Sequence, residues 1–153
     1  EMIREVRFSG TTFAAPPHQF EAGTPNIAGF VGMAAAIDYY QALGFEAIHA
    51  WEQQLLAYAT ERLREIPGLR IVGEAAEKEP VISFLIDGAQ ATDLATLLDL
   101  EGVAVRSGHH CAHPLMQFYG VPSTLRASLA FYNTREEVDA LIAALLKVRR
   151  ILR

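Results

Sequence analysis

The side chains best suited to chemistry gather in one stretch, Arg106–Pro114, which reads Arg-Ser-Gly-His-His-Cys-Ala-His-Pro. It holds the only cysteine of the 153 residues and three of the five histidines. A single cysteine cannot form an internal disulfide, so Cys111 is expected to be a free thiol. Neighbouring imidazoles and a guanidinium favour the thiolate, which is the nucleophilic form of cysteine. The residue types therefore predict nucleophilic thiol chemistry at Cys111.

The residues on either side predict how Cys111 is positioned. The run Val103–Val105 is rich in β-branched residues and predicts a strand that ends near Arg106. Gly108 permits a turn, and Pro114 suits the first turn of a helix. Cys111 is therefore expected in a strand-to-helix loop, close to backbone amides that favour an anion.

Three other roles for Cys111 remain open at this point. It could be a buried small hydrophobic residue, a metal ligand within the histidine cluster, or part of a solvated loop without a role. Structural zinc sites usually take four ligands, often as spaced pairs, and the remaining histidines, His18 and His49, form no pair. No metal site is predicted.

Composition restricts the class of protein. The chain is long enough for one domain with a proper core, and 51% of its residues are hydrophobic. A net charge of −5 without a basic patch argues against nucleic-acid binding, and no apolar run has transmembrane length. A single free cysteine suits a reducing compartment, so a cytoplasmic location is expected.

Hydrophobic spacing predicts a mixed α+β domain, with a small mixed sheet and flanking helices. The helix capped by Asn26 is apolar on nearly all sides, so it is expected to be deeply buried or to lie at an interface. Residues 1–25 are expected to be irregular. The remaining expected elements are a helix over 45–66, a hairpin of strands over 69–73 and 81–87, a helix over 91–100, a strand over 124–131 and a helix over 135–152 capped by Thr134.

Arg126 lies in the last expected strand, which alternates clearly. Leu125, Ala127, Leu129 and Phe131 share one face of that strand. If that face is the core, Arg126 points away from it and its planar guanidinium is free to bind a carboxylate. A surface salt bridge is the alternative.

The stretch Arg106–Ala112 resembles the cysteine loop of the cysteine desulfurases, pyridoxal-phosphate enzymes of the class V aminotransferase group. Its Arg-X-Gly-His-His-Cys-Ala form resembles the Suf-type (group II) branch, which includes relatives acting on selenocysteine and cysteine sulfinate. Two further stretches, Phe20–Asn26 and Arg126–Thr134, resemble motifs of the same family in the expected order. The resemblance covers essentially the whole chain.

This resemblance implies a function. The cofactor would be pyridoxal 5′-phosphate, and Cys111 would attack the sulfur of L-cysteine, leaving L-alanine and a persulfide. A Suf-type sulfur-acceptor protein would then take the sulfur for iron–sulfur cluster assembly. Arg126 would bind the substrate carboxylate, Arg106 would bind a carboxylate or shape the loop, and His109 or His110 would transfer a proton or shape the loop.

The resemblance also implies an assembly. Gly23 and Thr24 would approach the cofactor phosphate of a neighbouring subunit, which implies a homodimer. Physically, a small residue and a hydroxyl before a helix make a plausible phosphate contact. Neither lysine, Lys78 or Lys147, lies in the Ser-X-His-Lys surroundings of the family's cofactor lysine.

The chain is therefore interpreted as the C-terminal part of a fold-type I pyridoxal-phosphate enzyme. Residues 1–25 would be a connecting and interface segment, residues 26–153 the small domain, and the large cofactor domain would lie upstream, outside this chain. The chain alone is expected to be inactive. The alternatives are a selenocysteine lyase, a cysteine sulfinate desulfinase, or a cofactor-free thiol carrier or interaction domain.

Overall fold

The computed structural model describes residues 2–151. Its contacts divide the chain into two compact units, with the boundary between Phe45 and Glu46. These contacts group the first long helix with the segment before it, whereas the sequence interpretation draws its boundary at residue 25. Each unit is described by itself below.

The N-terminal unit begins with a hairpin instead of the irregular segment that was expected. Strands β1 (Ile3–Arg7) and β2 (Gly10–Phe13) pair antiparallel, with Arg7 opposite Gly10. Only Phe8 and Ser9 separate the strands, so Gly10, with a φ of 147°, begins a strand after a tight turn. A short 3-10 helix follows at His18–Phe20.

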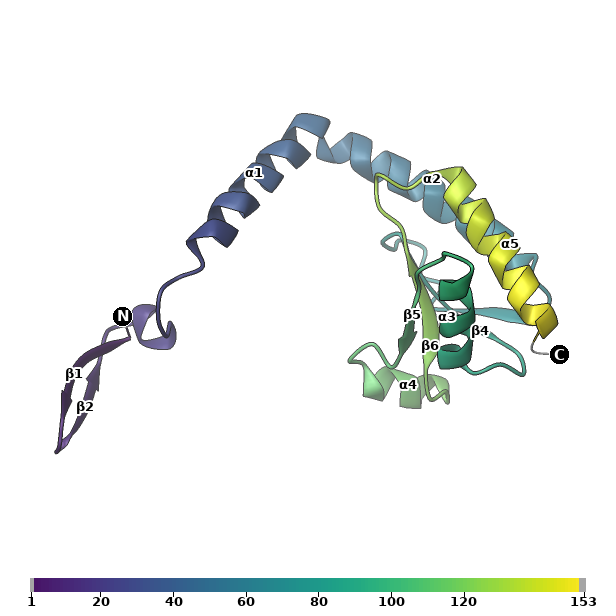
Figure 1. Ribbon diagram of the computed structural model, residues 1–153. Coiled ribbons are helices and arrows are strands. Elements are labelled where there is room, and N and C mark those ends of the chain that lie inside the picture. The colour runs from purple at the N-terminus through teal and green to yellow at the C-terminus, as the bar shows by residue number, and fades with distance from the viewer. Residues whose placement is uncertain (1, 152–153) are drawn as a thin grey trace. The chain divides into compact units, whose positions relative to one another are not determined.

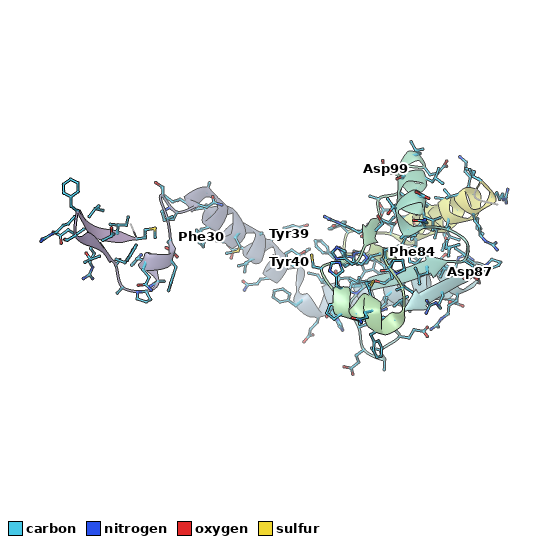
Figure 2. The ribbon with its side chains drawn as sticks, turned by 90° about the horizontal axis from the view of Figure 1, so that it is seen from below. Phe30, Tyr39, Tyr40, Phe84, Asp87 and Asp99 are labelled. Atoms are coloured by element: carbon cyan, nitrogen blue, oxygen red, sulfur yellow. The ribbon has the colours of Figure 1, made fainter. Side chains whose placement is uncertain are left out.

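Helix α1 (Ile27–Leu43) begins directly after Asn26, as predicted. The Asn26 side chain caps it by accepting a hydrogen bond from the Gly29 N–H at 3.0 Å. None of its residues is buried, and Phe30 is 63% exposed. Figure 2 shows Phe30, Tyr39 and Tyr40 along this helix. Deep burial is therefore wrong for the described residues, and the interface alternative stays a prediction.

The C-terminal unit contains nearly all of α2 and the remaining elements, drawn from blue to yellow in Figure 1. Its four-stranded sheet has the order β3-β4-β6-β5, and all the described pairs are antiparallel, where a mixed sheet was expected. The predicted class, a small sheet with flanking helices, is confirmed. The elements are α2 (Phe45–Arg64), β3 (Leu69–Val72), β4 (Val81–Ile86), α3 (Ala91–Leu100), β5 (Arg106–Gly108), α4 (His113–Tyr119), β6 (Thr124–Ser128) and α5 (Arg135–Ile151).

One face of this sheet builds the core. Phe84 and Leu125, opposite each other on β4 and β6, are fully buried against apolar side chains of α2, α3 and α5. Figure 2 shows Phe84 within this packed region. Strand alternation then places Ser83 and Arg126 together on the opposite face. None of the described helices has both the length and the apolar character that a membrane span needs.

Two strand boundaries differ from expectation, and both differences bear on the site. Strand β5 begins at Arg106 where a strand was expected to end, because Val103 donates its N–H to Leu98 O at 2.9 Å and so closes the end of α3. Strand β6 ends at Ser128, so Leu129 and Phe131 lie beyond the alternating segment. The expected end of the last helix, at residue 152, lies outside the described residues.

Thr134 caps α5 as predicted, and the structure adds the reciprocal bond of a capping box. Thr134 Oγ1 accepts from the Glu137 N–H at 3.3 Å, and Glu137 Oε2 accepts from the Thr134 N–H at 2.9 Å. Glu137 also accepts a hydrogen bond from Asn133 Nδ2 at 3.0 Å. The two bonds to its carboxylate, that from Asn133 being the stronger contribution and that from the Thr134 N–H the second, hold the pKa of the Glu137 carboxyl below its ordinary value of 4.5.

Candidate functional site

Cys111 lies in the connection between β5 and α4, as the sequence predicts, and it is a free, exposed cysteine. Figure 1 shows α4 at one end of β5 and β6, so the loop lies at that end of these two strands. The exposure contradicts the alternative of a buried small hydrophobic residue. An exposed thiol can be reached by a substrate or by a second protein.

The backbone at Cys111 adopts an unusual conformation. His110 and Cys111 have φ angles of 53° and 58°, in the left-handed region that side chains other than glycine rarely occupy. Ala112 donates its N–H to His109 O at 2.9 Å, which closes a turn whose two central residues are both left-handed. Each such residue costs on the order of 1–3 kcal/mol, so the surrounding contacts must hold the turn in place.

His110 supplies the first of those contacts. Its Nε2 lies 3.2 Å from Thr124 O and 3.1 Å from Thr124 Oγ1. Because a carbonyl oxygen can only accept, Nε2 carries the proton when it binds Thr124 O. Thr124 is fully buried on β6, so His110 anchors the cysteine loop to the sheet. Of the two roles expected for His110, these contacts favour loop shaping.

His109 supplies the second contact, from within the turn. The Cys111 N–H donates to His109 Nδ1 at 3.1 Å. The His109 ring stacks on His113, with ring centroids 3.7 Å apart and an angle of 26° between the planes. Sequence reasoning considered His113 only as a metal ligand and missed this contact, which the spacing of the two imidazoles across a helix start could have indicated. Within residues 2–151, no three His, Cys, Asp or Glu side chains converge as metal ligands would.

Arg126 lies on the face of β6 that points away from the core, as predicted, because its neighbours Leu125 and Ala127 are buried. Across the sheet it is paired in register with Arg106 on β5 and with Ser83 on β4. The Arg126 Nε atom is buried and has no hydrogen-bond partner among the described residues. Two arginines opposite each other repel, and a buried unpaired donor is costly. An anion bound at this face would relieve both costs.

The sheet brings Arg126 and the cysteine loop together. Thr124, which anchors His110, and Arg126 are two residues apart on β6 and share one face. Two residues of a strand span roughly 7 Å, which is within the length of an amino-acid substrate and an arginine side chain. The cysteine loop and the candidate carboxylate site are therefore neighbours in the fold.

Gly23 and Thr24 lie in the N-terminal unit and are exposed. Gly23 has a φ of 79°, which a residue with a side chain would adopt only under strain, and α1 begins shortly after Thr24. The two lysines are engaged elsewhere. Lys78 Nζ donates to Gly73 O at 3.1 Å, and Lys147 Nζ pairs with Glu101 at 2.6 Å.

Comparison with known proteins identifies relatives over the whole chain. The family described as aminotransferase class-V matches residues 1–141. A probable cysteine desulfurase of Xylella fastidiosa (strain 9a5c) is 63% identical over 152 residues, which are 99% of this chain and 36% of that protein. A cysteine desulfurase of Serratia proteamaculans (strain 568) is 53% identical over 152 residues, 37% of its length. The chain thus spans little more than a third of these relatives.

Solved structures agree with the sequence relatives. The cysteine desulfurase CsdA (S-sulfonic acid) from Escherichia coli matches with a TM-score of 0.85 and 37% identity, over 99% of this chain and 38% of that one. The apo cysteine desulfurase from Thermococcus onnurineus NA1 matches with a TM-score of 0.83 and 38% identity, over 96% of this chain and 37% of that one. The fold is that of a fragment of a fold-type I pyridoxal-phosphate enzyme. By sequence and by structure, this chain belongs to the class-V aminotransferase family.

Proposed function

We propose that the full-length protein is a cysteine desulfurase of the Suf-type (group II) branch, which converts L-cysteine to L-alanine and leaves a persulfide on Cys111. The observation that carries this proposal is the exposed Cys111, held in a left-handed turn whose anchor on β6 lies two residues from Arg126. Its relatives of 63% and 53% identity are named probable cysteine desulfurase and cysteine desulfurase, respectively.

The proposed step uses the Cys111 thiolate as the nucleophile. Its Sγ attacks the sulfur of the substrate, so that a sulfur–sulfur bond forms while the carbon–sulfur bond of the substrate breaks. The electron pair of the broken bond stays with the substrate carbon, which takes up a proton and becomes the methyl group of alanine. Pyridoxal phosphate, when bound, supplies the electron sink that stabilises the electron pair left on this carbon.

The two arginines position the substrate in this scheme. Arg126 binds the α-carboxylate, and its buried, unpaired Nε is a donor available for that purpose. Arg106, opposite it in register, adds positive charge on the same face. His109 and His110 shape the loop through their bonds to the Cys111 N–H and to Thr124.

The described residues fit the cofactor only in part. Gly23 and Thr24 offer an exposed glycine turn and a hydroxyl before α1, which suits a phosphate of the cofactor in a neighbouring subunit and hence a homodimer. Lys78 and Lys147 have partners elsewhere on the C-terminal unit, so the covalent anchor for the cofactor is proposed to lie in the large domain outside this chain.

We place the enzyme in the cytoplasm, where a Suf-type acceptor protein takes the terminal sulfur from Cys111 for iron–sulfur cluster assembly. The exposure of Cys111 supports a transfer between proteins, because an acceptor thiol must reach the outer sulfur of the persulfide. A free thiol also suits a reducing compartment. Selenocysteine and cysteine sulfinate are the alternative substrates, and a cofactor-free thiol carrier is the alternative function.

One experiment separates these possibilities. The full-length protein is incubated with pyridoxal phosphate and L-cysteine, alanine is quantified, and the peptide containing Cys111 is examined by mass spectrometry for one added sulfur atom. We expect alanine and the persulfide in equal amounts in the first turnover. Faster turnover of selenocysteine or cysteine sulfinate would reassign the substrate, and sulfur loading without alanine would indicate a thiol carrier.

A further inference from the structure

His113 is the one imidazole near Cys111 that the function proposed above does not use. It is the first residue of α4 and is exposed, yet its ring lies flat against that of His109 at 3.7 Å between centroids. Contact between two stacked rings restricts the rotation of both side chains. The stack therefore fixes the orientation of the His109 ring.

That orientation matters because the His109 ring makes a directed hydrogen bond. Its Nδ1 accepts the Cys111 N–H at 3.1 Å, which requires a lone pair on Nδ1 and so places the proton of the neutral ring on Nε2. A rotation of the ring would remove this acceptor. The Cys111 N–H, at the left-handed turn, would then lose its hydrogen bond to His109 Nδ1.

We propose that His113 is a positioning residue for the nucleophile. Its ring restricts the rotation of the His109 ring, so that Nδ1 remains the acceptor of the Cys111 N–H. The hydrogen bond between Cys111 N–H and His109 Nδ1 keeps Cys111 in the left-handed conformation from which Sγ attacks the substrate. In this proposal His113 acts through His109 and not by contact with the substrate. The inference rests on the proposed function for its kinetic consequence, whereas its structural content stands apart from that function.

The test compares His113→Ala with His113→Phe in the full-length protein loaded with pyridoxal phosphate. Alanine keeps helix α4 but removes the ring, whereas phenylalanine keeps a flat ring that cannot take part in proton transfer. We expect His113→Ala to lower kcat for alanine formation by roughly fivefold, the change that an aromatic contact of ordinary strength corresponds to. The KM for L-cysteine stays the same, and His113→Phe restores kcat.

A second measurement does not depend on turnover. Hydrogen exchange at the Cys111 amide, followed by millisecond quench-flow and residue-resolved mass spectrometry, reports the bond to His109 Nδ1 directly. We expect faster exchange in His113→Ala and wild-type exchange in His113→Phe. His49→Ala, which removes an exposed histidine on α2, is the matched control and leaves exchange and kcat unchanged.

A double-mutant cycle completes the design. Because His113 acts through His109, the variant with both residues replaced by Ala should be no slower than His109→Ala alone. Additive losses, or wild-type amide exchange in His113→Ala, would overturn this positioning role. If the wild-type protein forms no alanine from L-cysteine, the proposed function fails, and the exchange rates still decide whether His113 positions the cysteine loop.

Discussion

Replacing Arg126 by Leu separates a binding role from a structural one. A binding role predicts a higher KM and an unchanged or higher free energy of unfolding, whereas a structural role predicts an unchanged KM and a lower free energy of unfolding. Hydrogen bonds to a charged group contribute about 1.5–3 kcal/mol, and each 1.4 kcal/mol corresponds to a factor of ten in affinity. Loss of the Arg126 guanidinium should therefore raise the KM for L-cysteine by about 10- to 150-fold in the full-length enzyme. Steady-state kinetics of alanine formation, with Arg126→Lys as the charge-retaining control, measure this change.

The same substitution should not weaken the fold. Arg126 lies opposite Arg106, its Nε is buried and unpaired, and its side chain points away from the core residue Leu125. Removing a like-charged cross-strand pair gains roughly 0.2–1 kcal/mol, so denaturant unfolding of the 153-residue chain should show equal or higher stability. An unchanged KM together with a loss of more than about 1 kcal/mol would show that Arg126 serves the fold and would refute the carboxylate site.

Three further outcomes are expected. Cys111→Ala in the full-length enzyme should abolish sulfur release and leave the visible absorption of the bound cofactor intact, whereas desulfuration at the parent rate would remove Cys111 from the mechanism. Because the pKa of Glu137 is depressed in the folded state, its carboxylate contributes stability that is present above the unfolded-state pKa and is lost as pH falls through the lower folded-state pKa. The Tm of the 153-residue chain should therefore exceed that of its Glu137→Gln variant at about pH 6, and this difference should shrink towards about pH 3. A Tm difference independent of pH would contradict this. The 153-residue chain alone should fold cooperatively. Mixed with pyridoxal phosphate, it should form no new visible absorption band and release no alanine from cysteine. Turnover that survives removal of full-length contaminant would instead identify Lys78 or Lys147 as the catalytic amine.

Much of the candidate site follows from local sequence. Gly108 and Pro114 bracket a connection between a strand and a helix, and Cys111 lies in it. The alternation around Leu125 correctly predicts that Arg126 faces away from the core. These predictions succeed because a strand has a side-chain period of two and proline fixes the first helical turn.

Predictions from local sequence fail where a partner strand or a distant residue determines the secondary structure. Val103–Val105 has the composition of a strand, but the hydrogen bond from Val103 to Leu98 uses this stretch to close α3, and pairing with β6 begins only at Arg106. The segment Ile3–Phe13 lies within the 25 residues expected to be irregular, and instead its two halves pair as antiparallel strands. Pairing depends on both strands at once, so composition alone is a weak guide to it.

The amino-acid sequence determines that the chain has one free thiol, that histidines and an arginine surround it, and that helices alternate with short strands. These properties depend on residue type and spacing, which are local. Only the tertiary structure decides that His110 reaches Thr124, that Arg106 and Arg126 are paired in register, and that His113 stacks on His109. The turn that brings His109 and His113 together has two left-handed residues without glycine, a conformation that the chain adopts because contacts with the sheet outweigh its local preference.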